Sequence, residues 1–124
     1  MKDAEEADVE KLVKSVLNVK LSESEDDPNK HISILDLPGS ILIIPQATLG
    51  GRMKGKMIQY HNNVNKEKGL TLYELFVNLC KKYTSENEKW SKSTNKCKVE
   101  SGTYGIRQVY ATDTNGPYLH MIEL

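Results

Sequence analysis

Apolar residues near the start of the chain repeat with the spacing of a helix. Five of them fall at positions i, i+3, i+4, i+7 and i+8, which places them on one helix face: Val9, Leu12, Val13, Val16 and Leu17. Acidic residues crowd the beginning of this segment, where they suit the positive end of the helix dipole, and Asp3 or Asp8 is expected to cap it. The polar stretch 22–30 breaks the pattern and is predicted to be a loop.

The next apolar segments predict a hairpin of two strands. Residues 31–37 alternate with a period of two, so that Ile32 and Ile34 share one face. Pro38-Gly39 predicts a turn, and residues 40–44 (SILII) have the length and apolar character of a buried strand. Residues 45–69 carry four glycines and many polar side chains, and we expect a long irregular loop there.

The second half of the chain predicts another helix and another hairpin. Residues 70–83 form an apolar stripe with helical spacing, made by Leu72, Leu75, Phe76, Leu79 and Cys80. Residues 85–96 are polar and are expected to be a loop. Residues 97–113 and 117–124 are then expected to pair around an Asn115-Gly116 turn, since both residues tolerate positive φ. The order of helix, two strands, helix and two strands predicts an α+β domain with antiparallel hairpins.

Composition adds limits on where the protein acts and what it binds. The chain is 38% hydrophobic and 27% charged, and no apolar run approaches the ~20 residues that span a bilayer, so no membrane partner is expected. Met1 is followed by charged residues instead of a secretory signal, and two cysteines make neither a disulfide framework nor a metal-site spacing. We therefore predict a cytoplasmic protein without a metal or other cofactor.

Charge is distributed unevenly although the net charge is zero. Residues 1–27 hold nine acidic residues against four lysines, and the rest of the chain has an excess of five basic residues. A basic half is compatible with nucleic-acid binding. An ordinary solvated surface is nevertheless the favoured interpretation before any motif is considered.

The residues alone offer no obvious acid, base or nucleophile. His31, His61 and His120 are far apart and lack zinc spacing with Cys or carboxylates. Cys80 lies on the apolar stripe, and burial raises the pKa of a thiol and makes it inert. A cysteine hydrolase that uses Cys80 or Cys97 stays open as an alternative.

Two short segments have a pattern that could form a site. PQATL (45–49) follows the predicted strand SILII directly, and in an extended chain Gln46 and Thr48 would share one face. TNGP (114–117) adds a stiff Gly116-Pro117 step to a turn that Asn-Gly already makes. Taken singly, the first could be a strand that ends in polar residues, and the second a plain hairpin turn.

Together the two segments resemble motifs of the D-aminoacyl-tRNA deacylase family. PQATL is similar to that family's Ser-Gln-Phe-Thr-Leu motif, TNGP to its Asn-x-Gly-Pro motif, and SGTYGIRQV (101–109) to the segment before it. The resemblance continues through VLNVKLSE, HISILDLPG and LYELFVNLC, in the same order, so it covers essentially the whole chain. Pro45, Ala47 and Thr114 depart from the general pattern and match the animal-specific branch of the family.

The resemblance implies a deacylase-like fold of antiparallel barrel-like sheets with two helices. Residues 1–124 are then expected to be a single domain that lacks the family's N-terminal strands. The implied assembly is a homodimer, and the implied partner is mischarged aminoacyl-tRNA.

The implied activity is that of an aminoacyl-tRNA editing hydrolase. It cleaves the ester of D-aminoacyl-tRNA and of L-alanine mischarged on threonine tRNA, with help from the ribose 2′-OH of the substrate. The resemblance gives Thr48 and Gln46 catalytic roles. It also implies that backbone N–H groups near Ala47 and Thr48 bind the developing oxyanion. The implied substrate-binding residues are Pro45, Ala47, Asn115, Gly116, Pro117, Tyr104 and Arg107, and the candidates for tRNA phosphates are Arg52, Lys54 and Lys56.

Gly116-Pro117 would be a wall of main chain that excludes L side chains, since Gly permits close approach and Pro fixes φ. The alternative is a non-catalytic, truncated module that binds tRNA or another partner.

Overall fold

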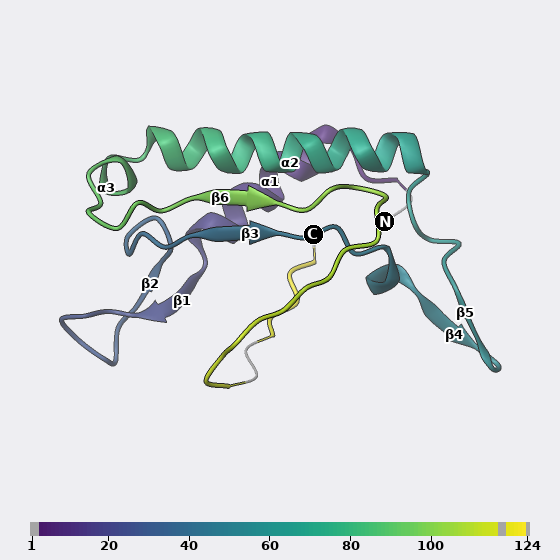
Figure 1. Cartoon of the computed structure of the whole chain (residues 1–124), viewed down its shortest axis with the longest axis horizontal. Coiled ribbons are helices and arrows are strands. Elements are labelled where there is room, and N and C mark those ends of the chain that lie inside the picture. Colours follow the sequence, from purple (N-terminus) through teal and green to yellow (C-terminus); the bar gives the residue numbers. More distant parts are fainter. Residues whose placement is uncertain (1–2, 117–118, 124) are drawn as a thin grey trace.

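The computed structural model of the chain describes residues 3–116 and 119–123. Its longest element is the helix α2 (Lys66–Glu86), and the strands β3 (Ile41–Ile43) and β6 (Val99–Ser101) run side by side beneath it (Figure 1). The helix α1 (Glu6–Asn18) packs against α2. The two helices and the β3–β6 pair together fix the positions of the segments that follow these two strands.

The first helix has the apolar face that the sequence predicts. The N-cap residue is Glu5 instead of Asp3 or Asp8, and Asp8 completes a capping box, because its carboxylate accepts a hydrogen bond from the Glu5 N–H at 3.0 Å. Val9, Val13 and Leu17 are buried in the core, together with Leu72 and Cys80 of α2. The predicted apolar stripe is therefore confirmed.

The second helix is confirmed and is longer than predicted. It begins where the Asn65 side chain accepts a hydrogen bond from the Lys68 N–H at 2.8 Å. Asn87 caps a short further helix, α3 (Glu88–Ser91), by accepting from the Trp90 N–H at 3.1 Å. The prediction of a loop over 85–96 is wrong at these residues, because an asparagine cap starts a helix without an apolar stripe.

Strand pairing differs from the predicted hairpin of residues 31–37 with 40–44. The strand β2 (His31–Ser33) pairs instead with β1 (Lys20–Glu23), in antiparallel orientation. It ends early because the N–H groups of Asp36 and Leu37 donate to the Ser33 carbonyl, which makes a turn. The strand β3 pairs in parallel with β6, so it joins segments that are far apart in the sequence.

The stretch 45–69 is ordered, so the prediction of an irregular loop is wrong. It contains a 3-10 turn, η1 (Ala47–Gly50), and a hairpin of β4 (Arg52–Lys54) and β5 (Met57–Gln59). Gly55 in the hairpin turn has a φ of +62°, which favours glycine. The hairpin side chains are largely exposed, so no alternation of apolar and polar residues marked these strands in the sequence.

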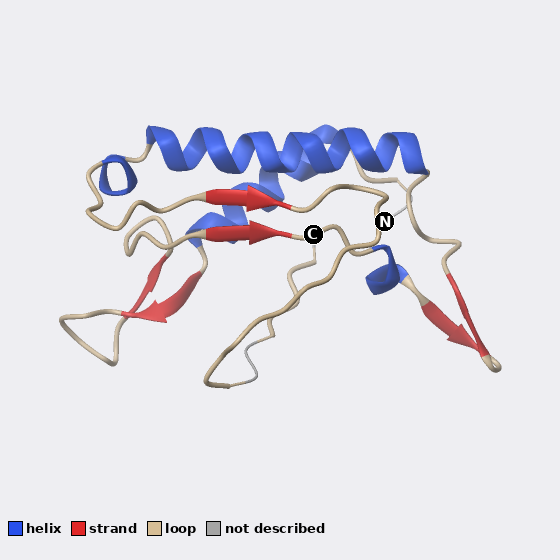
Figure 2. Cartoon of the chain, viewed as in Figure 1, coloured by secondary structure: helices blue, strands red, loops and turns tan. Residues whose placement is uncertain are grey.

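The predicted terminal hairpin is wrong for the residues that the structure describes. Only Val99–Ser101 form a strand there, and 102–116 and 119–123 run without strand pairing (Figure 2). Side chains of this segment stand in solvent, with Val109 98% and Leu119 94% exposed. The α+β class is confirmed, with the helices beside three two-stranded sheets in the described residues.

Two further kinds of feature are absent from residues 3–116 and 119–123. No helix there has the length and apolar character to cross a membrane. The same residues contain no cluster of three or more His, Cys, Asp or Glu side chains that could hold a metal ion.

Candidate functional site

The parallel pair of strands directs two distant segments to one groove. Parallel strands end at the same edge of a sheet, so the residues that follow β3 and β6 emerge together. After β3 the chain continues through residues 44–48, and after β6 through residues 102–107. These segments line a groove of about 1300 Å³.

Six of the twelve site residues that the sequence singled out lie at this groove. Its lining includes Pro45, Gln46, Ala47, Thr48, Tyr104 and Arg107. The first four come from the PQATL segment and the last two from the GTYGIR segment, so the structure brings the two segments together. These six residues therefore face one space, and their roles there stay a prediction.

Gln46 and Thr48 approach each other in a turn instead of an extended strand. The 3-10 turn η1 begins at Ala47, directly after Gln46. The Thr48 hydroxyl donates to Oε1 of Gln46 at 3.4 Å, and Asn63 Nδ2 donates to the Ala47 carbonyl at 3.0 Å. Within the described part of the chain, the N–H groups of Ala47 and Thr48 donate to no partner, as is usual at the start of a helical turn.

The opposite rim of the groove is held by a glutamine that sequence reasoning missed. The Gln108 side chain accepts from the Thr103 N–H at 2.8 Å and donates through Nε2 to the Thr103 carbonyl at 2.7 Å. The turn that this amide closes includes Gly105, whose φ of +78° favours glycine. The turn carries Tyr104 and Arg107, so its geometry decides where these side chains lie.

A second residue that sequence reasoning missed, Tyr73 of α2, joins the two strands where they reach the groove. Its hydroxyl lies 2.6 Å from the Gly102 carbonyl and 3.2 Å from the Ile43 carbonyl. The Gly102 N–H also donates to the Ile43 carbonyl, at 2.8 Å. The sequence carries no signal for this contact, because the half-burial that makes a tyrosine hydroxyl find a partner is known only from the structure.

Tyr104 packs closely against the same helix. Its ring centroid lies 5.7 Å from that of Tyr73, with a tilt of 38° between the rings. A Cβ atom at Gly69 of α2 would overlap the Tyr104 hydroxyl, so this glycine makes room for the side chain. The helix therefore forms the back of the groove and fixes one of its aromatic walls.

The TNGP segment lies outside this groove as far as it is described. The Thr114 hydroxyl donates to the Gly116 carbonyl at 3.1 Å and accepts from the Gly116 N–H at 3.4 Å. Neither Asn115 nor Gly116 lines the groove. Pro117, which the sequence hypothesis places beside them, lies outside the described residues.

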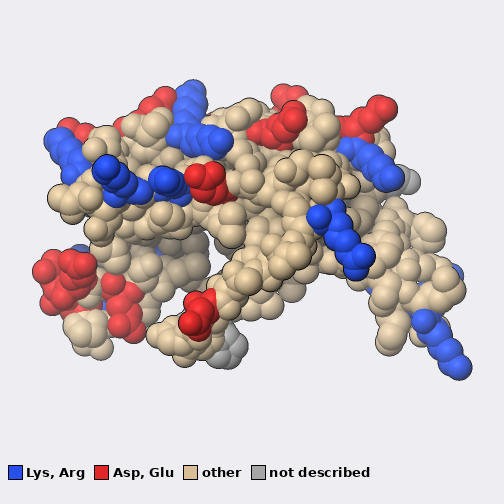
Figure 3. Space-filling model, viewed as in Figure 1, with Lys and Arg blue, Asp and Glu red and all other residues tan. Residues whose placement is uncertain are grey.

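The three cations singled out for tRNA lie on the projecting hairpin. Arg52 and Lys54 belong to β4, Lys56 to its turn, and all three are exposed. None forms an ion pair with the described part of the chain. Basic side chains reach into solvent at this end of the molecule (Figure 3).

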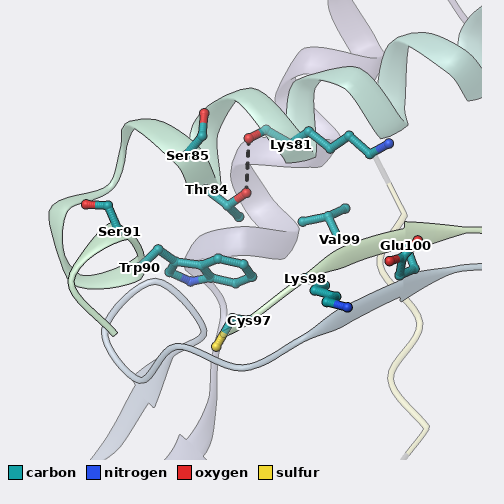
Figure 4. Close-up of a pocket in the computed structure, with 9 residues that line it drawn as sticks. All are labelled: Lys81, Thr84, Ser85, Trp90, Ser91, Cys97, Lys98, Val99 and Glu100. Carbon is teal, nitrogen blue, oxygen red and sulfur yellow. Dashed lines mark hydrogen bonds between the residues drawn. The ribbon is translucent and has the colours of Figure 1, made fainter. Parts of the chain in front are cut away.

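A second, smaller hollow of about 490 Å³ lies between the end of α2, α3 and β6 (Figure 4). It contains Cys97 and Trp90 but none of the residues that the motifs indicated. The other cysteine, Cys80, is 1% exposed, and burial raises the pKa of its thiol to about 11. Cys80 is therefore a protonated core residue at neutral pH.

Comparison with protein families gives a match over nearly the whole chain. Residues 1–123 match the family model described as D-Tyr-tRNA(Tyr) deacylase. The chain is 56% identical over 122 residues to the human protein named D-aminoacyl-tRNA deacylase 2, which covers 98% of this chain and 70% of the human one. Its identity to the Gallus gallus protein of the same name is 53% over 122 residues, covering 98% of this chain and 71% of the other.

Comparison with solved structures agrees with the sequence relatives. The chain is similar to a structure described as a probable eukaryotic D-amino acid tRNA deacylase, with a TM-score of 0.73 and 27% identity. The superposition covers 94% of this chain and 74% of that one. The arrangement of helices and strands around the groove is thus shared with a solved structure.

Proposed function

Because the chain belongs to the D-Tyr-tRNA(Tyr) deacylase family, we propose that it hydrolyses the ester that joins a D-amino acid to the terminal ribose of tRNA. The single observation that carries this proposal at the level of residues is the groove. It gathers the PQATL and GTYGIR segments, which are far apart in the sequence, around one space large enough for an aminoacylated nucleoside.

The proposed chemistry needs positioning and charge stabilisation more than a strong nucleophile. Thr48 and Gln46 orient the ester, and the N–H groups of Ala47 and Thr48 have free hydrogen atoms for the oxyanion of the tetrahedral intermediate. The ribose 2′-OH of the substrate helps to activate the attacking water. Pro45, Ala47, Tyr104 and Arg107 line the space around the amino acid.

The proposed assembly is a homodimer. Large apolar side chains of the C-terminal segment stand in solvent, among them Val109, Tyr110, Leu119 and Met121. In such a dimer, the wall that selects the configuration of the amino acid in one groove comes from the other subunit and consists of Asn115, Gly116 and Pro117. This proposal agrees with the structure in that neither Asn115 nor Gly116 lines the groove of its own chain. We also propose that the sheets close into a barrel-like arrangement. The three described strand pairs have unpaired edges, to which further strands can add.

L-alanine on threonine tRNA is proposed as a second substrate. A synthetase separates small side chains by only about 1–3 kcal/mol per methylene, so a separate hydrolytic site is needed to remove such errors. Arg52, Lys54 and Lys56 are proposed to contact tRNA phosphates from the hairpin. The cytoplasmic location and the lack of a cofactor are parts of the same proposal.

A deacylation time course tests the function directly. The purified chain is incubated with tRNA that carries a D-amino acid, with the matching L form, and with L-alanyl threonine tRNA. We expect the D-aminoacyl and L-alanyl esters to disappear faster than in buffer, while a bulky L ester persists. Loss at the buffer rate for all three, with tRNA binding retained, would instead favour the non-catalytic binding module.

Thiol alkylation separates this reaction from a cysteine hydrolase. At pH 8 the Cys80 thiol, with a pKa of about 11, stays protonated and buried, so iodoacetamide should modify Cys97 alone. We expect full activity on a minimal aminoacyl-adenosine ester after one alkylation per chain, counted by mass spectrometry. A loss of activity in proportion to the modification of Cys97 would support the cysteine hydrolase.

A further inference from the structure

The smaller hollow has two basic side chains at its rim that nothing in the proposed reaction uses. Figure 4 shows Lys81 on α2 and Lys98 directly before β6, with Val99 between them and Trp90 farther along the wall, beside Cys97. The indole N–H of Trp90 donates to the Ile34 carbonyl at 2.8 Å, which fixes the ring in place. The hollow, at about 490 Å³, is within the usual ~300–1,000 Å³ range of ligand pockets.

Both lysines are free to meet an anion. Within residues 3–116 and 119–123, neither Lys81 nor Lys98 forms an ion pair, whereas Lys89 and Lys92 nearby are paired with Asp36 and Glu88. In Figure 3 several basic side chains lie over this end of the molecule, with acidic side chains among them. Glu100 is the single carboxylate in the lining, so the site keeps an excess of one positive charge.

The hollow and the active-site groove lie along the same elements. The strand β6 leads from Lys98 at the hollow to Ser101 and Gly102 at the groove. On α2, Tyr73 faces the groove and Lys81 follows eight residues later, which is about 12 Å at ~1.5 Å per residue. With one phosphate per ~3.4 Å along a strand, this separation corresponds to about three or four nucleotides.

We propose that Lys81 and Lys98 bind phosphates of the tRNA strand that precedes the aminoacylated end held in the groove. This inference rests on the proposed function for its choice of RNA. The lysines neutralise phosphates and anchor the strand, while the groove acts on the ester. A ligand that ends at the terminal nucleoside does not reach them.

The test compares a double variant, Lys81→Gln with Lys98→Gln, with a control of equal charge change, Lys11→Gln with Lys14→Gln on α1. Binding of uncharged tRNA is measured by fluorescence anisotropy from 50 to 200 mM salt. We expect the double variant to weaken binding about threefold to thirtyfold and to lower the salt slope by about one to two, since each phosphate contact to single-stranded RNA contributes ~0.7. Glu100→Gln should strengthen binding.

Turnover separates this inference from the proposed function. The double variant should lose kcat/KM on aminoacyl-tRNA by a similar factor, and should match the unaltered chain on a minimal aminoacyl-adenosine ester. Equal salt slopes for the double variant and the control would overturn the inference. An unaltered chain that hydrolyses neither ester would refute the proposed function, while the salt slopes would still decide the inference.

Discussion

Replacing Thr48 by alanine should lower the rate of D-aminoacyl-tRNA deacylation about 100-fold, the loss expected when a substrate ester is misplaced by about 1 Å. The physical reason is the position of its hydroxyl, 3.4 Å from Oε1 of Gln46 at the groove, where the substrate ester is proposed to bind. The measurement is kcat/KM on D-aminoacyl-tRNA. Because the Thr48 side chain is exposed, the melting temperature should stay within about 2 °C of the original, as expected for a surface change within ±0.5 kcal/mol.

Two matched variants make this result specific. Thr48→Ser keeps the hydroxyl and should retain most of the activity. Thr71→Ala removes an exposed threonine hydroxyl that donates only to the Glu67 carbonyl on α2, and should leave the rate unchanged. If Thr48→Ala deacylates as fast as the unaltered chain, the assignment of the site to the PQATL segment is wrong.

The helices were predictable because their signal is local. Val9, Val13 and Leu17 repeat at helical spacing, and burying that stripe against α2 requires no knowledge of distant segments. The helix beginnings at Asn65 and Asn87 depend on single capping hydrogen bonds and were missed. A helix that starts on a cap in polar sequence has no apolar stripe by which to recognise it.

The strand pairing was not predictable for a physical reason. The strands have three or four residues each, too few for an alternating pattern to specify a partner. Pairing of Ile41 with Val99 in parallel is decided by α1 and α2, against which both side chains pack, and not by the turn at Pro38-Gly39. The predicted hairpins followed adjacency in sequence, which the tertiary packing overrides.

The sequence predicted part of the candidate site. Its motif segments can be recognised in the sequence, whereas the residues that hold them in place act through tertiary contacts. PQATL was singled out by its residue types and GTYGIR by the family resemblance, and the structure places both at the groove. Gln108, Asn63 and Tyr73 hold these segments through hydrogen bonds to backbone groups, and such bonds leave no spacing pattern in a sequence. The residues of recognisable motifs are thus easier to predict than the residues that hold those motifs in place.

The change Tyr73→Phe should lower kcat about tenfold or more with little change in KM for aminoacyl-tRNA. The hydroxyl that joins the Gly102 and Ile43 carbonyls would be lost, at 2.6 and 3.2 Å, and a half-buried carbonyl left without its donor costs about 1–3 kcal/mol. Without the hydroxyl, the distance between Thr48 and the Tyr104 turn is expected to change, and this distance matters most in the transition state. Each ~1.4 kcal/mol added to the activation barrier lowers kcat tenfold. Steady-state kinetics on D-aminoacyl-tRNA measure both constants.

The control for Tyr73 is Tyr83→Phe on the same helix. Tyr83 donates its hydroxyl to the Glu10 carboxylate at 3.0 Å and does not line the groove. Glu10 also pairs with Lys14, and the pKa of its carboxyl is lowered first by that lysine and then by Tyr83, so the carboxylate keeps a partner after the change. We expect kcat of Tyr83→Phe to equal that of the unaltered chain. Equal kcat for both variants would show that the Tyr73 hydroxyl stabilises the strands without positioning the site, because a role in stability alone would appear in the melting temperature and leave the chemistry unchanged.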